Sequence, residues 1–234
     1  MKATYNLKGI ILSRSAFRER DSKITIYSLE KGRIELVVRG TFKVDSKLSG
    51  HIEALNLSSI MAVRGKSFDY AGTVFCENAY AFIRKDYFKI ILANRIFKLI
   101  LKEIKENEVD EEIFHLLKNF LDVLNLENII INDIDFYYYV FLFKFLDKLG
   151  YSPNLDFKFS QKNKIKYFSL ESSSFVENPK VIDKYTIGIE DKLINLLILV
   201  KKIDFKDLFN SNFSLRDKKE FKKVVSLFYR YNFS

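Results

Sequence analysis

Residues Ile24 to Val38 read ITIYSLEKGRIELVV, and this stretch decides how the first third of the chain folds. Apolar and polar residues alternate on both sides of Lys31 and Gly32. Successive side chains of a β-strand point to opposite faces, so the alternation predicts two strands joined by a tight turn, with one face inward. The inward residues are Ile24, Ile26, Ile34, Leu36 and Val38, and the outward positions include Thr25, Arg33, Glu35 and Arg39.

Further strand-like stretches surround this hairpin and predict a small barrel. One precedes it at Leu7–Ser15, and two follow a loop, at Asn56–Gly65 and Phe68–Asn78. Phe68 is expected in the core because it begins a strand. Five strands in about 80 residues suit a closed five-stranded barrel of the OB type. We therefore predict a barrel domain over residues 1–80.

The apolar spacing changes to that of helices after about Ala81. Helical stripes are predicted within residues 88–104, 110–124, 132–149, 189–203 and 215–231. Between them, residues 154–180 are polar and serine-rich, which indicates an irregular insert. The predicted fold class is α+β, with a β-barrel followed by a mainly α-helical domain over residues 81–234 that contains this insert.

Composition favours a folded protein of the cytoplasm. The chain has 234 residues, of which 48% are hydrophobic, and a single cysteine, Cys76, which cannot form an internal disulfide. The most apolar run, FYYYVFLF at residues 136–143, is much shorter than the roughly 20 residues that span a bilayer. We expect a buried helix there, no membrane contact, and no secretion signal at the N-terminus.

Positive charge gathers in the predicted barrel. The net charge is +9, and residues 1–80 hold 13 Lys and Arg against 8 Asp and Glu. The loop VVRGTFKVDSKLSG, residues 37–50, carries three cations against Asp45 alone. A basic barrel binds nucleic acid through phosphate contacts and through stacking of bases on aromatic rings. The predicted DNA-binding residues are Arg14, Arg18, Arg20, Lys23, Arg33, Arg39, Phe42, Lys43 and Lys47.

Residues for catalysis are scarce. One cysteine and two histidines do not supply a zinc site, and no glycine-rich phosphate loop is present. A Mg²⁺-dependent nuclease needs clustered carboxylates. The nearest candidates are Glu19 with Asp21 and Asp133 with Asp135, which are better explained as turn or ion-pair residues and as helix-start residues. We expect no enzymatic activity.

Several segments, in order, resemble the RecO family of bacterial recombination mediators. They are KGIILSR (8–14), the pair Glu19 and Asp21, TIYSLEKGRIELVVRG (25–40), SKLSGHIEALN (46–56) and FLDKLGYSPNLD (145–156). The resemblance implies a non-catalytic DNA repair and recombination protein that binds single- and double-stranded DNA and anneals complementary strands. It also implies help in loading recombinase onto DNA coated with single-strand-binding protein.

The partners that this resemblance implies are RecR, in some systems RecF, and the acidic tail of the single-strand-binding protein, with the protein acting on nucleoid DNA. A groove between helices with a basic rim would suit such a tail. The candidate rim residues are Lys98, Lys102, Lys105, Lys201, Lys202, Lys218, Lys219, Lys222 and Lys223. Two alternatives stay open: another OB-fold nucleic-acid-binding accessory protein, and a Mg²⁺-dependent nuclease.

One departure from the family concerns zinc. Many members carry paired zinc-binding cysteines after the Leu-Asp stretch, whereas residues 158–161 and 172–178 contain none. We therefore expect no zinc and no other cofactor. Residues 154–180 should be held by apolar packing or be the least ordered part of the chain. The packing residues would be Phe157, Phe159, Ile165, Tyr167, Phe168 and Phe175.

Overall fold

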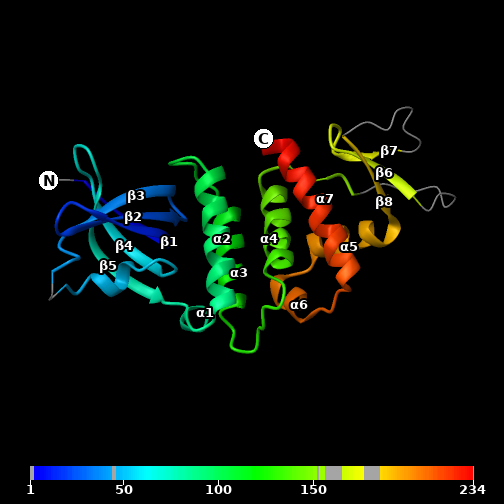
Figure 1. The fold of residues 1–234 in the computed structure, drawn as a ribbon. Coiled ribbons are helices and arrows are strands. Elements are labelled where there is room, and N and C mark those ends of the chain that lie inside the picture. The colour runs from blue at the N-terminus through cyan, green and yellow to red at the C-terminus, as the bar shows by residue number, and fades with distance from the viewer. Residues whose placement is uncertain (1–2, 44–45, 152, 156–164, 177–184, 234) are drawn as a thin grey trace. The chain divides into compact units, whose positions relative to one another are not determined.

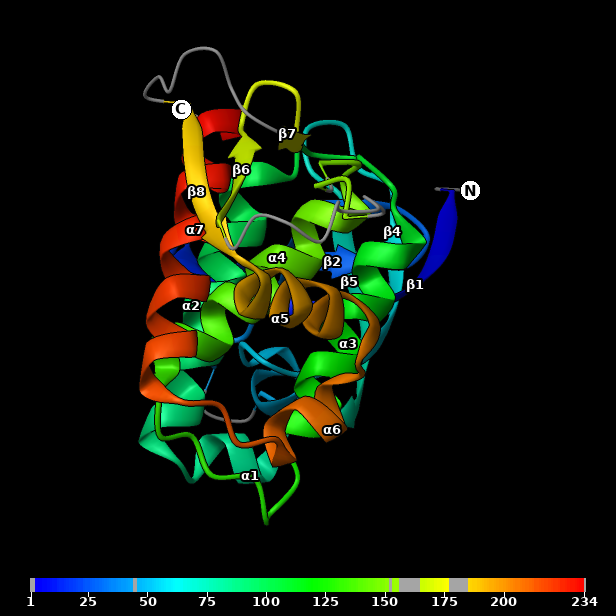
Figure 2. The same ribbon diagram turned by 90° about the vertical axis from the view of Figure 1, so that its right-hand side faces the viewer.

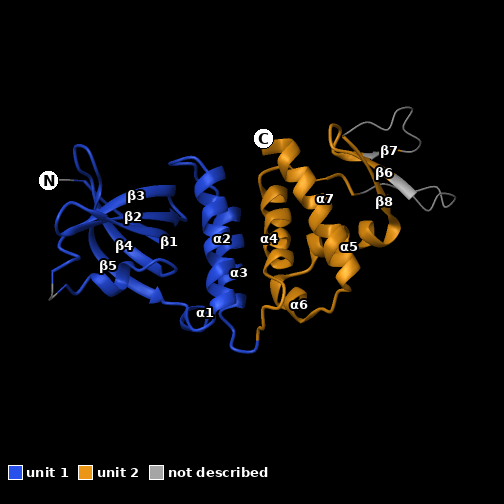
Figure 3. Cartoon of the chain, viewed as in Figure 1, with its two compact units in different colours: residues 1–128 blue, residues 129–234 orange. Residues whose placement is uncertain are grey.

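A computed structural model describes residues 3–43, 46–151, 153–155, 165–176 and 185–233. The chain divides into two compact units, residues 1–128 and residues 129–234 (Figure 3). The last barrel strand ends at Asn78 and the first helix begins at Ala81, where the sequence changes its periodicity. The first unit nevertheless extends past this change and includes three helices. Each unit is described separately below.

The first unit contains the predicted five-stranded barrel (Figure 1). Its strands are β1 (Thr4–Phe17), β2 (Asp21–Ser28), β3 (Gly32–Val38), β4 (Leu57–Val63) and β5 (Tyr70–Asn78). They close in the order β1-β2-β3-β5-β4. The strand β1 pairs with β4 through its first half and with β2 through its second half. The fold class predicted from the sequence is therefore confirmed.

The barrel interior is filled by the alternating residues of the hairpin. In the antiparallel register of β2 and β3, Ile26 lies opposite Ile34 and Ile24 lies opposite Leu36. These four side chains are buried in one apolar cluster with Val38, as predicted. A short 3-10 helix, η1 (Ser49–Ile52), adds the fully buried Ile52 to the same cluster.

Three helices of the first unit cover part of the barrel's outer surface. They are α1 (Ala81–Arg84), α2 (Tyr87–Glu103) and α3 (Glu111–Leu124). The hydroxyl of Tyr27 on β2 donates to the backbone oxygen of Asp110 at 3.2 Å. The guanidinium of Arg84 donates to Ala54 O at 2.6 Å and to Asn56 Oδ1 at 2.7 Å. Tyr27 is fully buried, and this burial raises the pKa of its hydroxyl.

The second unit is built on three packed helices. They are α4 (Ile134–Lys148), α5 (Asp191–Lys202) and α7 (Leu215–Phe233), with the short α6 (Phe205–Asn210) between the last two. The aromatic run of α4 lies in the core, where the ring of Phe136 is 5.7 Å from that of Phe221. Within the described part of the chain, no helix has the length and apolar character needed to cross a membrane.

The predicted insert is less irregular than its composition suggests. A three-stranded sheet in the order β7-β6-β8 is formed by β6 (Ile165–Ser169), β7 (Ser174–Val176) and β8 (Thr186–Glu190) (Figure 2). Phe168 is buried and its ring lies 6.1 Å from that of Phe228 on α7. Strands of three and five residues are too short for a periodic signal. The predicted packing residues Phe157 and Phe159 lie outside the described residues.

A half-buried lysine fastens α5 to α4. The ammonium of Lys144 on α4 donates to the backbone oxygens of Lys201 at 3.2 Å and Ile203 at 2.7 Å. These carbonyls belong to the end of α5, where helices have unsatisfied acceptors and partial negative charge. Burial lowers the pKa of Lys144 from the ordinary 10.5 to about 8. The folded protein therefore loses this proton more readily than the unfolded chain does.

This difference predicts a pH dependence of stability. Between pH 8 and 10.5 the unfolded chain binds more protons at Lys144 than the folded chain, so folding is favoured as pH rises. The expected quantity is the unfolding free energy of the wild-type protein minus that of Lys144→Met. This difference should be constant below about pH 8 and rise by about 2 kcal/mol between pH 8 and 10.5, allowing for partial solvent access. Urea unfolding of both proteins across this range measures the difference, and a constant difference would contradict the assignment.

Candidate nucleic-acid interface

Two loops are tied together at one end of the barrel. The first is the β1–β2 turn, and the second follows β3. The backbone N–H of Gly40 donates to Asp21 Oδ1 at 2.9 Å, and that of Phe42 donates to Arg20 O at 3.2 Å. Gly40 has φ of +67°, a conformation that favours glycine and turns the chain toward the β1–β2 turn. The Asp21 carboxylate therefore has a structural role here.

The β4–β5 loop joins the same end. The backbone N–H of Val37 on β3 donates to Asp69 O at 2.9 Å, and the rings of Phe17 and Phe68 meet edge to face at 5.4 Å. Phe68 is 39% exposed, so its predicted place in the core is wrong: it lies in the loop before β5 and not in the strand. We call the surface formed by residues 17–21, 39–43 and 64–70 the loop end.

Arginine side chains lie over aromatic rings at the loop end. The guanidinium carbon of Arg18 is 5.1 Å from the centre of the Phe17 ring, and that of Arg39 is 4.3 Å from the centre of the Tyr70 ring. Phe42, one of the predicted DNA-binding residues, is 50% exposed. Such pairs hold a cation beside a flat apolar face, which suits contact with both phosphates and bases. The sequence did not indicate Tyr70 as a site residue, because Tyr70 comes to lie under Arg39 only in the folded barrel.

Five of the predicted cations are exposed and form no ion pair with the described residues: Arg18, Arg20, Arg39, Lys43 and Lys47. Lys47 lies in the segment between the loop end and η1, and Asp45 lies outside the described residues. The exposed Arg64 and Lys66 add two cations from the β4–β5 loop. Lys66 was missed because a single lysine next to a glycine gives no signal in the sequence.

Two other predicted cations are engaged inside the first unit. Arg14 donates to Ser22 Oγ at 3.2 Å, to Ser49 O at 3.2 Å and to the Glu53 carboxylate. Its guanidinium also lies 5.5 Å from the centre of the Phe42 ring. Lys23 on β2 pairs with Glu35 on β3 at 2.9 Å. Arg14 thus supports η1 and the ring of Phe42, while the charge of Lys23 is balanced by its neighbour.

Arg33 is directed away from the loop end, toward the helices. Its Nη1 donates to Leu101 O at 2.5 Å near the end of α2, and Nη2 lies 4.0 Å from Glu106 Oε1. Its backbone oxygen accepts from the N–H of Asn107 at 2.8 Å. The structure therefore assigns Arg33 to the contact between the barrel and the helices.

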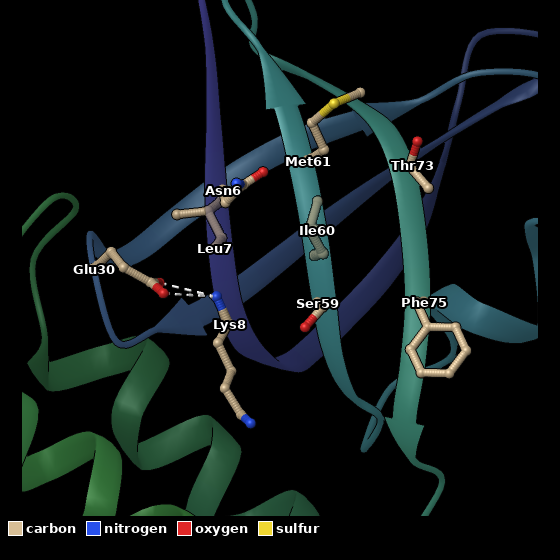
Figure 4. Close-up of a pocket in the computed structure, with 9 residues that line it drawn as sticks. All are labelled: Asn6, Leu7, Lys8, Glu30, Ser59, Ile60, Met61, Thr73 and Phe75. Carbon is tan, nitrogen blue, oxygen red and sulfur yellow. Dashed lines mark hydrogen bonds between the residues drawn. The ribbon is translucent and has the colours of Figure 1, made fainter.

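A hollow of about 430 Å³ lies on another outer face of the barrel, over β1, β4 and β5 (Figure 4). The Lys8 ammonium pairs with Glu77 at 2.6 Å, and the Lys8 backbone N–H donates to the Glu30 carboxylate at 2.9 Å. Hydrogen bonds from Lys8 and then Ser59 lower the pKa of Glu77. With its lysine paired and two glutamates beside it, this hollow does not favour a polyanion.

Two of the four carboxylates considered for a metal, Asp21 and Asp133, have structural partners. Asp21 accepts from Gly40, and Asp133 caps α4 by accepting from the N–H of Phe136 at 2.9 Å. Over the described ranges, histidine, cysteine and acidic residues form no group of three or more that could hold a metal ion. The loop end thus presents exposed cations and, among the described residues, no such group of metal ligands.

Two family profiles match consecutive parts of the chain. "Recombination protein O N terminal" matches residues 1–74, and "Recombination protein O C terminal" matches residues 84–234. The chain belongs to the recombination protein O (RecO) family. The resemblance seen in the sequence is confirmed, and it extends through the C-terminal residues that the sequence segments alone left uncovered.

Curated RecO-family relatives carry the name "DNA repair protein RecO". The relative from Desulforamulus reducens is 28% identical over 53% of this chain and 48% of its own length. That from Pelotomaculum thermopropionicum is 29% identical over 65% of this chain and 57% of its own length. The chain thus spans about half the length of these two relatives. A third, from Caldanaerobacter subterraneus, is 20% identical over 95% of this chain and 90% of its own length.

The position of Arg33 predicts a stability effect. Arg33→Met should lower the free energy of unfolding by about 1–3 kcal/mol, because the carbonyl of Leu101 loses its charged donor. Arg39→Met is the control, since it replaces an exposed arginine directly after the opposite end of the same strand, β3, and should change stability by no more than about 0.5 kcal/mol. Urea unfolding measures both, and equal losses would place Arg33 outside the contact between barrel and helices.

Proposed function

We propose that this protein is a DNA-binding recombination mediator that anneals complementary strands and helps load recombinase onto DNA covered by single-strand-binding protein. The observation that carries the proposal is the loop end. There, cations without an ion pair among the described residues lie over the half-buried rings of Phe17 and Tyr70, and the rings of Phe42 and Phe68 are exposed. The proposed DNA-contacting residues are Arg18, Arg20, Arg39, Phe42, Lys43 and Lys47, with Arg64 and Lys66. Membership of the RecO family supports a role in DNA repair.

The chemistry of annealing fits such a surface. Two single strands repel each other through their phosphates, and lysine and arginine side chains lower this repulsion without reading the sequence. Exposed rings such as Phe42 offer stacking faces for unpaired bases. The bases keep their hydrogen-bonding edges free when they stack, so they can find their complements. No covalent bond changes in this step, which agrees with a protein that is not an enzyme.

The proposed partners are those of the family. They are single- and double-stranded DNA, RecR, the acidic tail of the single-strand-binding protein, and in some systems RecF. Two candidate rim lysines for the tail are engaged within the second unit: Lys201 pairs with Asp147 at 3.0 Å, and Lys222 lies 3.6 Å from Asp133. These two lysines therefore support the helix packing, and the tail would use others.

We further propose that the small sheet of the second unit is held without zinc. Phe168, Leu170 and Ile189 are buried on this sheet, and Phe168 packs on Phe228 of α7. A zinc site built from paired cysteines needs at least two thiolates, and this chain has a single cysteine. Apolar packing would then supply the free energy that metal binding supplies in other members.

Charge reversal at the loop end tests the DNA-binding proposal. If about five cations contact duplex phosphates, log affinity falls with log salt with a slope near −4.5, and removing three contacts brings the slope to about −1.8. The variant is Arg18→Glu/Arg39→Glu/Lys43→Glu. Its control, Lys85→Glu/Lys192→Glu/Lys206→Glu, makes the same charge change at exposed positions outside the loop end and the candidate rim, and should keep the slope. Fluorescence anisotropy with labelled duplex at several salt concentrations measures both.

The same proteins are then assayed for annealing of complementary oligonucleotides, with and without single-strand-binding protein. If the wild-type protein and the control accelerate annealing and the loop-end variant does not, the result supports the proposed mediator function. Binding without acceleration would indicate an OB-fold accessory protein instead. Shortening of labelled DNA on addition of Mg²⁺, lost in Glu19→Gln/Asp21→Asn, would indicate the nuclease.

Phe168 and a chelator together test the proposal on zinc. Phe168→Ala should lower the free energy of unfolding by about 3–5 kcal/mol, and Phe168→Leu by less, because each leaves a cavity of different size. Incubation of the wild-type protein with 1,10-phenanthroline should leave its melting temperature unchanged. A fall on chelation that added zinc restores would show that a metal holds the protein together.

A further inference from the structure

The exposed side of α7 carries a row of cations. Arg216, Lys219, Lys223 and Arg230, together with Ser226, fall within an arc of about 80° at 3.6 residues per turn. The acidic residues of the helix, Asp217 and Glu220, lie outside this arc. The opposite side of the helix is buried through Phe221, Val224, Val225 and Phe228. We call these four cations the α7 stripe.

Three members of the α7 stripe have no ion pair. Lys219, Lys223 and Arg230 are exposed, and no carboxylate of the described residues pairs with them. Arg216 alone is paired, with Glu190 at 2.8 Å and Glu220 at 2.9 Å. From Lys219 to Arg230 the helix rises about 16 Å, at 1.5 Å per residue. The unpaired charges therefore form a straight row that a nucleic-acid backbone can follow.

Aromatic rings gather where the α7 stripe ends. The Phe233 ring lies 4.9 Å from that of Tyr151 and 5.4 Å from that of Tyr229. On the other flank of Arg230, the Tyr231 ring lies 5.4 Å from that of Tyr185. Tyr151 is 42% exposed and Tyr231 is 38% exposed. Figure 2 shows this C-terminal end of α7 beside the small sheet.

We propose that the α7 stripe and these rings form a second binding surface, specific for single-stranded nucleic acid. The cations attract phosphates, and the exposed faces of Tyr151 and Tyr231 stack unpaired bases. A duplex keeps its base faces covered, and the aspartate and glutamate side chains of an acidic peptide have no large flat face, so neither uses the rings. The inference rests on the proposed annealing function, in which the protein holds two strands at once: one at the loop end and one on the second unit.

Photo-cross-linking of the full chain to oligo(dT), followed by mass spectrometry of the cross-linked peptides, tests the second surface. Wild-type protein should give cross-links at Tyr151 or Tyr231 as well as at Phe42. In Lys219→Glu/Lys223→Glu/Arg230→Glu the tyrosine cross-links should disappear while that at Phe42 persists. The loop-end variant should show the reverse. Cross-links confined to the first unit in the wild-type protein would overturn the second surface and leave the proposed function standing.

Salt titrations provide an independent measurement. Loss of three single-strand contacts should reduce the slope of log affinity against log salt by about 2, at about 0.7 per contact. The control Lys85→Glu/Lys192→Glu/Lys206→Glu should keep the wild-type slope. Lys219→Gln/Lys223→Gln/Arg230→Gln repeats the test without adding negative charge. It replaces the Glu variant if circular dichroism shows that the Glu variant is unfolded. An unchanged slope in the α7-stripe variants would refute the proposal. Loss of binding to an acidic peptide in these variants, with binding to oligo(dT) unchanged, would refute it as well.

Discussion

Every strand of a closed five-stranded sheet has two neighbours, and the closure of this barrel depends on β1, which pairs with its two neighbours over different parts of its length. Its first half pairs with β4 and its second half with β2, with a shift of register between Ile11 and Ser13 where the pairing changes. Closure leaves few backbone groups of the barrel without partners. It also fixes where the strands end, so that the turn after β1, the chain after β3 and the loop before β5 meet.

The closed barrel determines which contacts each of its arginine side chains makes. Arg14, Arg33 and Arg39 are alike in the sequence, yet the first supports η1, the second reaches the end of α2, and the third lies over Tyr70 in solvent. The first two side chains make hydrogen bonds that a polyanion would have to replace. Net charge therefore describes the attraction of the whole first unit for a polyanion, while hydrogen-bond geometry decides which cations are available for contact.

Local patterns predicted the elements, and contacts between distant residues decided the rest. Alternation fixed the hairpin from Ile24 to Val38, and Asp110 and Asp133 marked the helix starts that they cap. The partner of Arg33 is 68 positions away, and no local pattern reports such a contact. Phe68 was misplaced because its strand begins two residues later, at Tyr70. The strands β6 and β7 and the helix α6 are too short for a period to be read.

The seam between β3 and β5 has a mechanical consequence. Within the barrel these two strands are joined through a single residue pair, Val37 with Tyr70, whereas every other neighbouring pair shares a long ladder. Arg39 crosses this seam to reach the ring of Tyr70. A ligand that binds residues of both β3 and β5 therefore holds together the strand pair that shares the fewest ladder contacts in the barrel. Occupancy and folding stability are then thermodynamically linked, because whatever binds only the closed barrel also keeps it closed.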